Sequence, residues 1–82
     1  MILLFACVQN VKNPTFLKAL GQRIKRLRED RKLTQLALGE LCNNHAEQIG
    51  RIERGELNVS ICSLLIIADA LEIDLKELFD FN

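Results

Sequence analysis

The sequence predicts an all-α domain built from five short helices, and three observations carry this prediction. Apolar residues recur three or four positions apart, which is the spacing of one helix face. Capping residues precede these stretches, and one proline with four glycines leaves little room for long irregular loops. With 82 residues the chain is one domain, so we expect a short apolar arm over residues 1–14 and the folded domain over residues 15–82.

The first helix is expected from about residue 15 to residue 30. Asn13 and Pro14 form a helix-start signal, because proline suits the first helical position. An apolar stripe follows at helical spacing: Leu17, Leu20, Ile24 and Leu27. The basic residues of this helix are therefore expected to lie largely outward.

The second helix should begin after Thr34, whose hydroxyl is suited to an N-cap. Its inner face is expected to be formed by Leu38, Leu41 and Cys42. Asn43 tolerates the left-handed backbone conformation that ends many helices, so the second helix should stop there.

A third helix is expected from about Ala46 to Glu53, with Ile49 and Ile52 facing inward and Gly55 ending it. Ser60 is a strong N-cap for a fourth helix. The apolar residues of that helix are Ile61, Leu64, Leu65, Ala68 and Leu71. Asp74 and Glu77 have the spacing of a capping box and should start a fifth helix that runs through Leu78 and Phe79.

The charge of the chain is unevenly distributed, although its formal net charge is zero. Residues 18–32 hold seven basic and two acidic side chains, whereas residues 69–80 hold five acidic side chains and one lysine. Such an asymmetry can orient a protein on a charged partner. It is equally compatible with an ordinary solvated helix face, and both interpretations remain open at this point.

Several classes of protein are disfavoured by composition. Three widely spaced cysteines, Cys7, Cys42 and Cys62, indicate reduced thiols of a cytoplasmic protein and no disulfide framework. No apolar run approaches the ~20 residues of a membrane span, and the apolar opening lacks the basic residues of a secretory signal. With one histidine, no second half of a metal site and no nucleophile–base pair, we expect no metal, no cofactor and no enzymatic activity.

The segment TQLALGELCNNHAEQIGRIERG (residues 34–55) resembles the helix-turn-helix of the phage repressor/Cro-like family of bacterial transcription factors. The resemblance needs no gaps and extends from LGQRIKRLREDRKLTQ (residues 20–35) to LLIIADALEIDLKELF (residues 64–79). It implies a compact five-helix lambda-repressor-like DNA-binding domain with the helix-turn-helix at about 34–54. In that family the second helix of the motif enters the major groove of double-stranded DNA.

Carried over position by position, the resemblance implies base contacts from the third helix: Ala46, Glu47, Gln48, Gly50 and Arg51. Arg51 is the strongest candidate, because its forked donors match O6 and N7 of guanine. Gln48 is suited to adenine, and Ala46 to the methyl group of thymine.

Two of these positions have alternative interpretations. Glu47 either accepts a hydrogen bond from cytosine or closes a capping box with Asn44, and we favour the cap. Gly50 either allows close approach to DNA or is a tolerated loss of about 0.8–1 kcal/mol in helix stability. Glu53 occupies a structural position in the family, so we expect it to hold an arginine or backbone groups.

Phosphate contacts are expected from three sources. The basic first helix offers Arg23 and Arg26, with Lys32 just beyond its end. The resemblance implies a contact from Gln35, at the first turn of the second helix, and another from Asn58 in the loop after the third. Arg54 completes the set.

A dimer interface is predicted from apolar residues that the core pattern does not use. Cys62 and Ile66 lie four positions apart and form one stripe on the fourth helix. The N-terminal arm, whether a strand or an unpaired segment, contributes Leu3 and Phe5. A homodimer would place two recognition helices ~34–36 Å apart on a palindromic operator.

These expectations describe a small cytoplasmic homodimeric transcriptional regulator that binds double-stranded DNA and has no ligand domain. A rival hypothesis is a protein-interaction module, such as an antitoxin that grips a partner protein through its acidic C-terminal half. The zero net charge and Glu47 favour the rival, whereas the helix-turn-helix motif opposes it.

Overall fold

The computed structural model describes residues 13–43 and 46–81, and it folds them into five helices. These are α2 (Pro14–Asp30), α3 (Gln35–Leu41), α4 (Ala46–Glu53), α5 (Ile61–Ala70) and α6 (Leu75–Leu78). The predicted all-α class is confirmed. Leu3, Phe5, Asn44 and the rest of residues 1–12 and 44–45 lie outside the described residues, so expectations about them stay predictions.

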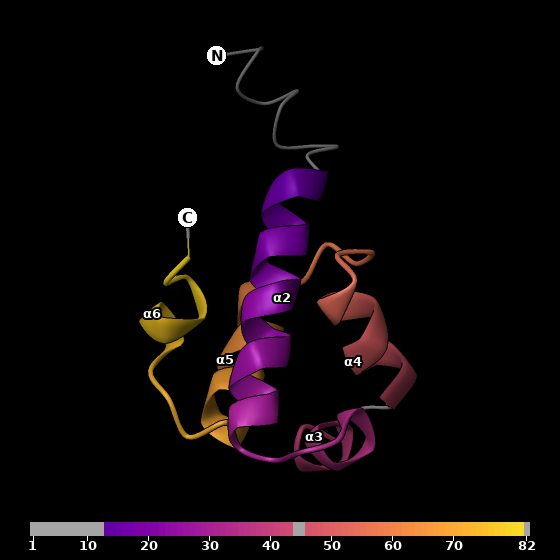
Figure 1. The fold of residues 1–82 in the computed structure, drawn as a ribbon, viewed down its shortest axis with the longest axis vertical. Helices are drawn as coiled ribbons and strands as arrows, with labels where there is room; N and C mark the ends of the chain where they lie inside the picture. Colours follow the sequence, from indigo (N-terminus) through magenta and orange to yellow (C-terminus); the bar gives the residue numbers. More distant parts are fainter. Residues whose placement is uncertain (1–12, 44–45, 82) are drawn as a thin grey trace.

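Helix α2 runs through the middle of the molecule, with α4 on one side and α6 on the other (Figure 1). Helix α5 lies behind α2 in this view, and α3 crosses below the C-terminal end of α2. This arrangement gives α2 two flanks, one beside α4 and one beside α6.

Three of the predicted N-caps are confirmed. Asn13 Oδ1 accepts a hydrogen bond from the Phe16 backbone N–H at 3.0 Å, Thr34 Oγ1 from Ala37 at 3.0 Å, and Ser60 Oγ from Ser63 at 3.1 Å. Each bond satisfies one of the N–H groups that a helix start leaves without an intrahelical partner.

The capping box predicted at Asp74 is wrong. The Asp74 side chain makes no capping hydrogen bond, and the first turn of α6 is held instead by the Glu77 N–H donating to the Asp74 carbonyl at 3.0 Å. Helix α6 ends at Leu78, one residue earlier than expected.

The helix ends use the left-handed backbone region. Asn43 (φ 56°) and Gly55 (φ 76°) adopt it, as predicted. Lys32 (φ 57°) and Glu72 (φ 60°) also adopt it, after α2 and α5, although neither residue type favours this conformation. Both turns are closed by backbone hydrogen bonds, from Leu33 to Arg28 at 3.1 Å and from Ile73 to Ala68 at 3.0 Å.

The hydrophobic core draws on all five helices. Its members are Leu20, Ile24, Leu38, Cys42, Ile49, Ile52, Leu64, Ile67, Ala68, Leu71 and Leu78. Within the part of the chain that the structure describes, no helix combines the length and apolar character needed to cross a membrane.

Leu41, expected on the inner face of α3, is exposed by 59%, and two of the apolar residues named for α5, Ile61 and Leu65, are exposed by 63% and 49%. The inner face of α3 is formed by Leu38 and Cys42, one turn apart, which leaves Leu41 on another side of this short helix. Helix α5 turns Leu64, Ile67 and Ala68 inward, and the positions next to them in sequence face out. The apolar residues of α3 and α5 therefore form part of the core and part of the exposed surface.

Candidate nucleic-acid interface

Helix α4 is fixed to the body of the protein by its inner face, where Ile49 and Ile52 are buried. On its outer side Glu47 and Arg51 are exposed, and Ala46 and Gln48 are half-buried. Four of the five predicted base-contact residues thus retain access to solvent. The fifth, Gly50, is buried.

A buried polar network joins three helices behind α4. Arg28 of α2 donates from Nε to Glu53 Oε2 at 2.6 Å and from Nη2 to Glu53 Oε1 at 3.1 Å. Its Nη1 also donates to the Leu33 carbonyl at 2.7 Å, and Gln35 Nε2 donates to Glu53 Oε1 at 3.0 Å. The hydrogen bond with Glu53 raises the pKa of Arg28, against the opposing effect of burial.

This network tests two expectations from the sequence, one about Glu53 and one about the basic residues of α2. Glu53 holds an arginine, as predicted for a structural position. Arg28, by contrast, departs from the expectation that the basic residues of α2 lie outward, because its guanidinium neutralises the buried carboxylate. Gln35 is oriented by Glu53 and so stands at a defined place at the start of α3.

Gly50 explains how Gln35 and Arg54 fit beside α4. A Cβ at position 50 would lie 3.1 Å from Arg54 Nη1 and 3.2 Å from Gln35 Oε1. The space that the missing side chain leaves is therefore shared by two polar side chains of the protein itself. One interpretation of the sequence is that Gly50 allows close approach to DNA. In the structure, Gly50 makes room for the Gln35 and Arg54 side chains.

Arg51, Arg54 and Glu56 form a cluster at the C-terminal end of α4. Arg54 donates to Glu56 from Nε at 2.8 Å and from Nη2 at 3.3 Å, and Arg51 Nε lies 3.9 Å from Glu56 Oε1. The hydrogen bond with Glu56 is the main cause that raises the pKa of Arg54. All three side chains are well exposed, so salt screens these pairs strongly.

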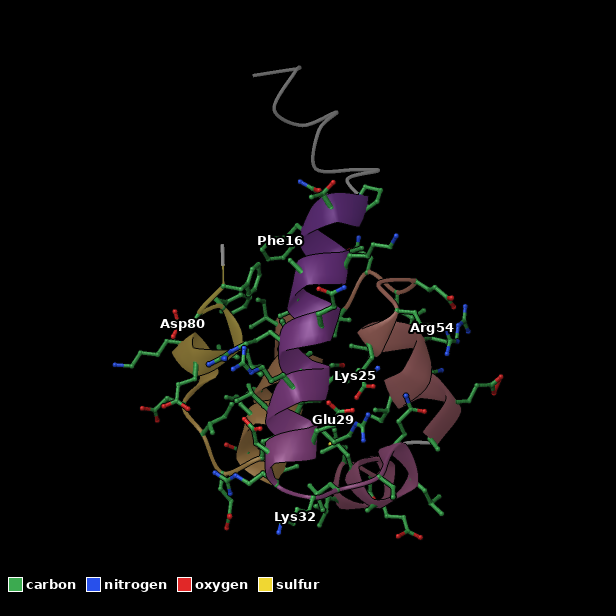
Figure 2. All side chains as sticks on the ribbon, viewed as in Figure 1. Phe16, Lys25, Glu29, Lys32, Arg54 and Asp80 are labelled. Carbon is green, nitrogen blue, oxygen red and sulfur yellow. The ribbon has the colours of Figure 1, made fainter. Side chains whose placement is uncertain are left out.

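The flank of α2 beside α4 carries residues that the sequence analysis did not select. Lys18, Gln22 and Lys25 line a hollow together with Gln35 and Arg54. The acidic residues Glu53 and Glu56 line it too. Lys25 and Arg54 lie on the α4 side of α2, whereas Asp80 lies on the opposite side (Figure 2). The signal was present in the sequence, since positions 18, 22 and 25 have the spacing of one helix face around Gly21, which packs against α4.

Arg23 and Arg26, the two residues selected instead, lie on the other flank. Arg23 donates from Nε to the Glu77 carbonyl at 2.9 Å, and Arg23 and Arg26 line a hollow with Asp80 and Phe81. These residues belong to the α6 side of the molecule. The structure therefore does not bring the predicted phosphate contacts Arg23 and Arg26 to the surface of α4.

The remaining predicted phosphate contacts are exposed. Lys32 follows the C-terminal end of α2, just before α3. Asn58 lies in the loop between α4 and α5, beside a hollow that Gln48, Ser60 and Ser63 also line. Asn58 is therefore close to α4 through Gln48.

An apolar face is exposed on α5. Cys62 is exposed, and Leu65 and Ile66 are about half exposed, at 49% and 50%. Ile66 borders a hollow lined also by Leu33, Leu41 and Ala70, with Arg31, Asp69 and Glu72 supplying charge. The predicted stripe of Cys62 and Ile66 thus extends to the exposed end of α3. Among the described residues, no group of three histidine, cysteine or acidic side chains is placed to hold a metal ion.

Comparison with known proteins agrees with this geometry. The model of a helix-turn-helix family matches residues 24–78. The immunity repressor protein of Bacillus phage phi105 is 42% identical over 57 residues, which are 70% of this chain and 40% of the repressor. The chain thus spans less than half the length of that relative.

Two solved structures have the same fold. The restriction-modification controller protein C.AhdI from Aeromonas hydrophila superposes with a TM-score of 0.76 at 40% identity, over 77% of this chain and 96% of the controller. The P22 c2 repressor protein, solved in complex with a synthetic operator, gives a TM-score of 0.67 at 30% identity, over 72% and 89% of the two chains.

These matches define a class of DNA-binding transcriptional regulators. The chain belongs to the helix-turn-helix family. Its resemblance to phage repressors, expected from the motif alone, is confirmed.

Proposed function

We propose that this protein is a homodimeric transcriptional regulator that binds double-stranded DNA sequence-specifically, with α4 in the major groove. One observation carries the proposal: Lys18, Lys25, Gln35, Arg51 and Arg54 gather on the surface around α4. Helix α4 itself is held by a buried inner face and by the bond between Arg28 and Glu53. A rigid helix with exposed donors and flanking cations is what base reading and phosphate binding require.

Within this surface, Arg51 is assigned to guanine, Gln48 to adenine and Ala46 to a thymine methyl group. Gln35 is assigned to a phosphate, because it opens α3 and helix N-termini present backbone N–H groups to anions. Lys18 and Lys25 add phosphate contacts, in place of Arg23 and Arg26. Glu47 is exposed in the first turn of α4, where it either reads cytosine or stabilises the helix start.

A second copy is the partner we assign to the exposed face of α5. A single eight-residue recognition helix contacts few base pairs, and each mismatched pair costs only about 1–3 kcal/mol. Two copies bound to a palindromic operator double the contacts and therefore the discrimination. The pairing of an apolar stripe with a charged border suits an interface between soluble protomers.

The relatives support the regulatory role. The phi105 relative is named an immunity repressor, C.AhdI is a restriction-modification controller, and the P22 c2 repressor was solved in complex with a synthetic operator. A repressor, a controller and an operator complex all agree with a regulatory, DNA-binding role.

The test is fluorescence anisotropy with a duplex selected from a random-sequence pool and with a scrambled version of it, at about 50 and 200 mM salt. We expect tight binding to the selected duplex, weakened by salt, and a palindromic selected sequence. Arg51→Ala should abolish the preference. Arg26→Ala is the matched control, because Arg26 is an exposed arginine on the flank of α2 beside α6, away from α4.

Two results would contradict the proposal. Equal affinity for both duplexes would exclude sequence-specific binding. Loss of the preference in Arg26→Ala to the same extent as in Arg51→Ala would show that α4 is not the reading element.

A further inference from the structure

The turn after α4 fixes the position of Glu56. Gly55, at φ 76°, bends the chain back, and the Glu56 N–H donates to the Arg51 carbonyl at 2.9 Å. Gly55 also packs against α2 so closely that a Cβ there would lie 2.9 Å from the Cα of Lys18. The backbone at Glu56 is therefore held against the last turn of α4 from two directions.

The Glu56 carboxylate engages both exposed arginines of the proposed DNA surface. Its Oε2 accepts from Arg54 Nε at 2.8 Å, and its Oε1 accepts from Arg54 Nη2 at 3.3 Å. The same Oε1 lies 3.9 Å from Arg51 Nε. One acidic side chain thus neutralises part of the charge that DNA phosphates would otherwise attract.

Gly50 makes this arrangement possible. Because position 50 lacks a side chain, the guanidinium of Arg54 lies back along α4, with Nη1 only 3.1 Å from where a Cβ would stand. From there Arg54 reaches Glu56 with two hydrogen bonds. The space at Gly50 and the hydrogen bonds from Glu56 together hold the Arg54 side chain against α4.

We propose that Glu56 sets the sequence selectivity of this surface by competing with DNA phosphates for Arg51 and Arg54. The proposal rests on the DNA-binding function proposed above. A phosphate must replace the carboxylate beside these guanidinium groups, which lowers the sequence-independent part of the affinity. The pair with Arg51, at 3.9 Å between exposed side chains, contributes less to this competition than the hydrogen bonds with Arg54 do. Non-specific binding, which relies on phosphates, is therefore weakened more than specific binding.

The test compares Glu56→Gln with Asp80→Asn. Both changes preserve side-chain shape and remove one negative charge from an exposed carboxylate that pairs with an arginine. Asp80 lies 3.9 Å from Arg23, on the α6 side of the molecule, so it controls for net charge. Dissociation constants are measured by anisotropy for the selected and the scrambled duplex at about 50 and 200 mM salt.

Glu56→Gln is expected to raise affinity for the scrambled duplex by roughly two- to fivefold at the lower salt, with a smaller gain at the higher salt. Affinity for the selected duplex should change less, so the ratio between the two affinities falls. Asp80→Asn should leave that ratio unchanged. Equal changes on both duplexes, or an effect of Glu56→Gln no larger than that of Asp80→Asn, would overturn the proposal.

A second pair of variants tests whether the effect passes through Arg54. In an Arg54→Gln background, Glu56→Gln should give a smaller gain on the scrambled duplex, because one of the competing guanidinium groups is absent. An undiminished gain would show that Glu56 acts by another route. Failure of the DNA-binding function is recognised separately, since the unaltered protein would then not distinguish the two duplexes.

Discussion

At the scale of single residues, two glycines lie inside helices and are buried for different reasons. A Cβ on Gly21 would lie 2.5 Å from the Glu53 carbonyl oxygen and closer still to that of Ile52, both backbone atoms of α4. A Cβ on Gly50 would meet only the ends of the Gln35 and Arg54 side chains. A side chain at position 21 would require α4 to move away from α2. A side chain at position 50 would require only small shifts of two side-chain ends.

Gly21→Ala is therefore expected to lower the free energy of unfolding by about 1–3 kcal/mol, the usual cost of overpacking. Gly50→Ala should not lower it, because alanine gains up to ~1 kcal/mol in helix propensity while two side-chain ends shift. Urea unfolding followed by circular dichroism measures both. A Gly21→Ala protein as stable as the parent would show that α2 and α4 do not pack this closely.

Cys42 and Cys62 differ in environment and should differ in chemistry. Cys42 is buried in the core and Cys62 is exposed on α5. Burial raises the pKa of the Cys42 thiol above its usual value of 9.0. The unfolded chain therefore loses this proton at lower pH than the folded chain does, and stability falls as pH rises above about 9.

The expected result is a decline in the free energy of unfolding above about pH 9 that is smaller in Cys42→Ala than in the parent. Lysines also titrate in this range, so the comparison is between the two slopes. Alkylation with iodoacetamide, mapped by mass spectrometry, measures the exposure of each thiol independently. In the Ile66→Lys variant, which should leave the α5 face uncovered, Cys62 should react in the folded protein and Cys42 only after unfolding; equal reactivity would contradict the described core.

At the scale of helices, the network of Arg28, Glu53 and Gln35 ties α2, α4 and α3 together. Arg28→Ala leaves the Glu53 carboxylate buried without its cationic partner, so we expect a loss of about 3–5 kcal/mol in the free energy of unfolding. Arg31→Ala, which breaks the exposed pair with Glu72, should cost at most about 1 kcal/mol. Arg28 itself stays charged throughout the accessible pH range, because the hydrogen bond with Glu53 raises its pKa above its usual value.

Chemical denaturation of both variants separates these outcomes. Similar losses from Arg28→Ala and Arg31→Ala would mean that the buried pair holds the helices no better than a surface pair does. The double variant Arg28→Met/Glu53→Leu provides a further check. It should recover much of the stability lost in Arg28→Ala, because no buried charge is then left unpaired.

Local signals account for the parts of the fold that the sequence predicted well. Asn13, Thr34 and Ser60 cap helices through bonds to residues three positions on, so their role depends only on nearby sequence. Asn43 and Gly55 end helices for reasons of backbone conformation that are equally local. The helix-turn-helix motif then placed α3 and α4 relative to each other.

Long-range packing decided the parts that the sequence did not predict. Periodicity predicts the inner face of α2 but not which flank meets α4. Arg23 is therefore predicted as a phosphate contact, whereas Lys25 is the residue that lies on the α4 side. Asp74 has the spacing of a capping residue, yet its side chain makes no cap in the structure. Leu41 and Leu65 fit a core pattern by hydropathy, but neighbouring positions already fill the core. For Arg23 the deciding contact joins distant segments, since its Nε donates to the Glu77 carbonyl.

At the scale of the whole molecule, the structure exposes two surfaces of different character. The surface around α4 is polar and rich in cations, and the exposed face of α5 is apolar. A protein that used only the first would have no reason to expose Ile66 and Leu65 beside Leu41. We therefore expect the α5 face to be covered by a second copy whenever the protein binds a palindromic operator.

Ile66→Lys tests this expectation, because two lysines facing each other across a symmetric interface would repel and lose apolar contact. Sedimentation velocity should show a dimer for the parent chain and a monomer for Ile66→Lys. Leu36→Lys is the matched control, since Leu36 is equally apolar and exposed but lies on α3 near its first turn. The control should stay dimeric.

In monomeric Ile66→Lys each protomer would bind a half-site alone. Ile66→Lys should therefore also weaken binding to a palindromic duplex by at least about tenfold, while binding to a single half-site is unchanged. A monomeric parent chain, or a dimer that survives Ile66→Lys, would assign the α5 face to a different partner.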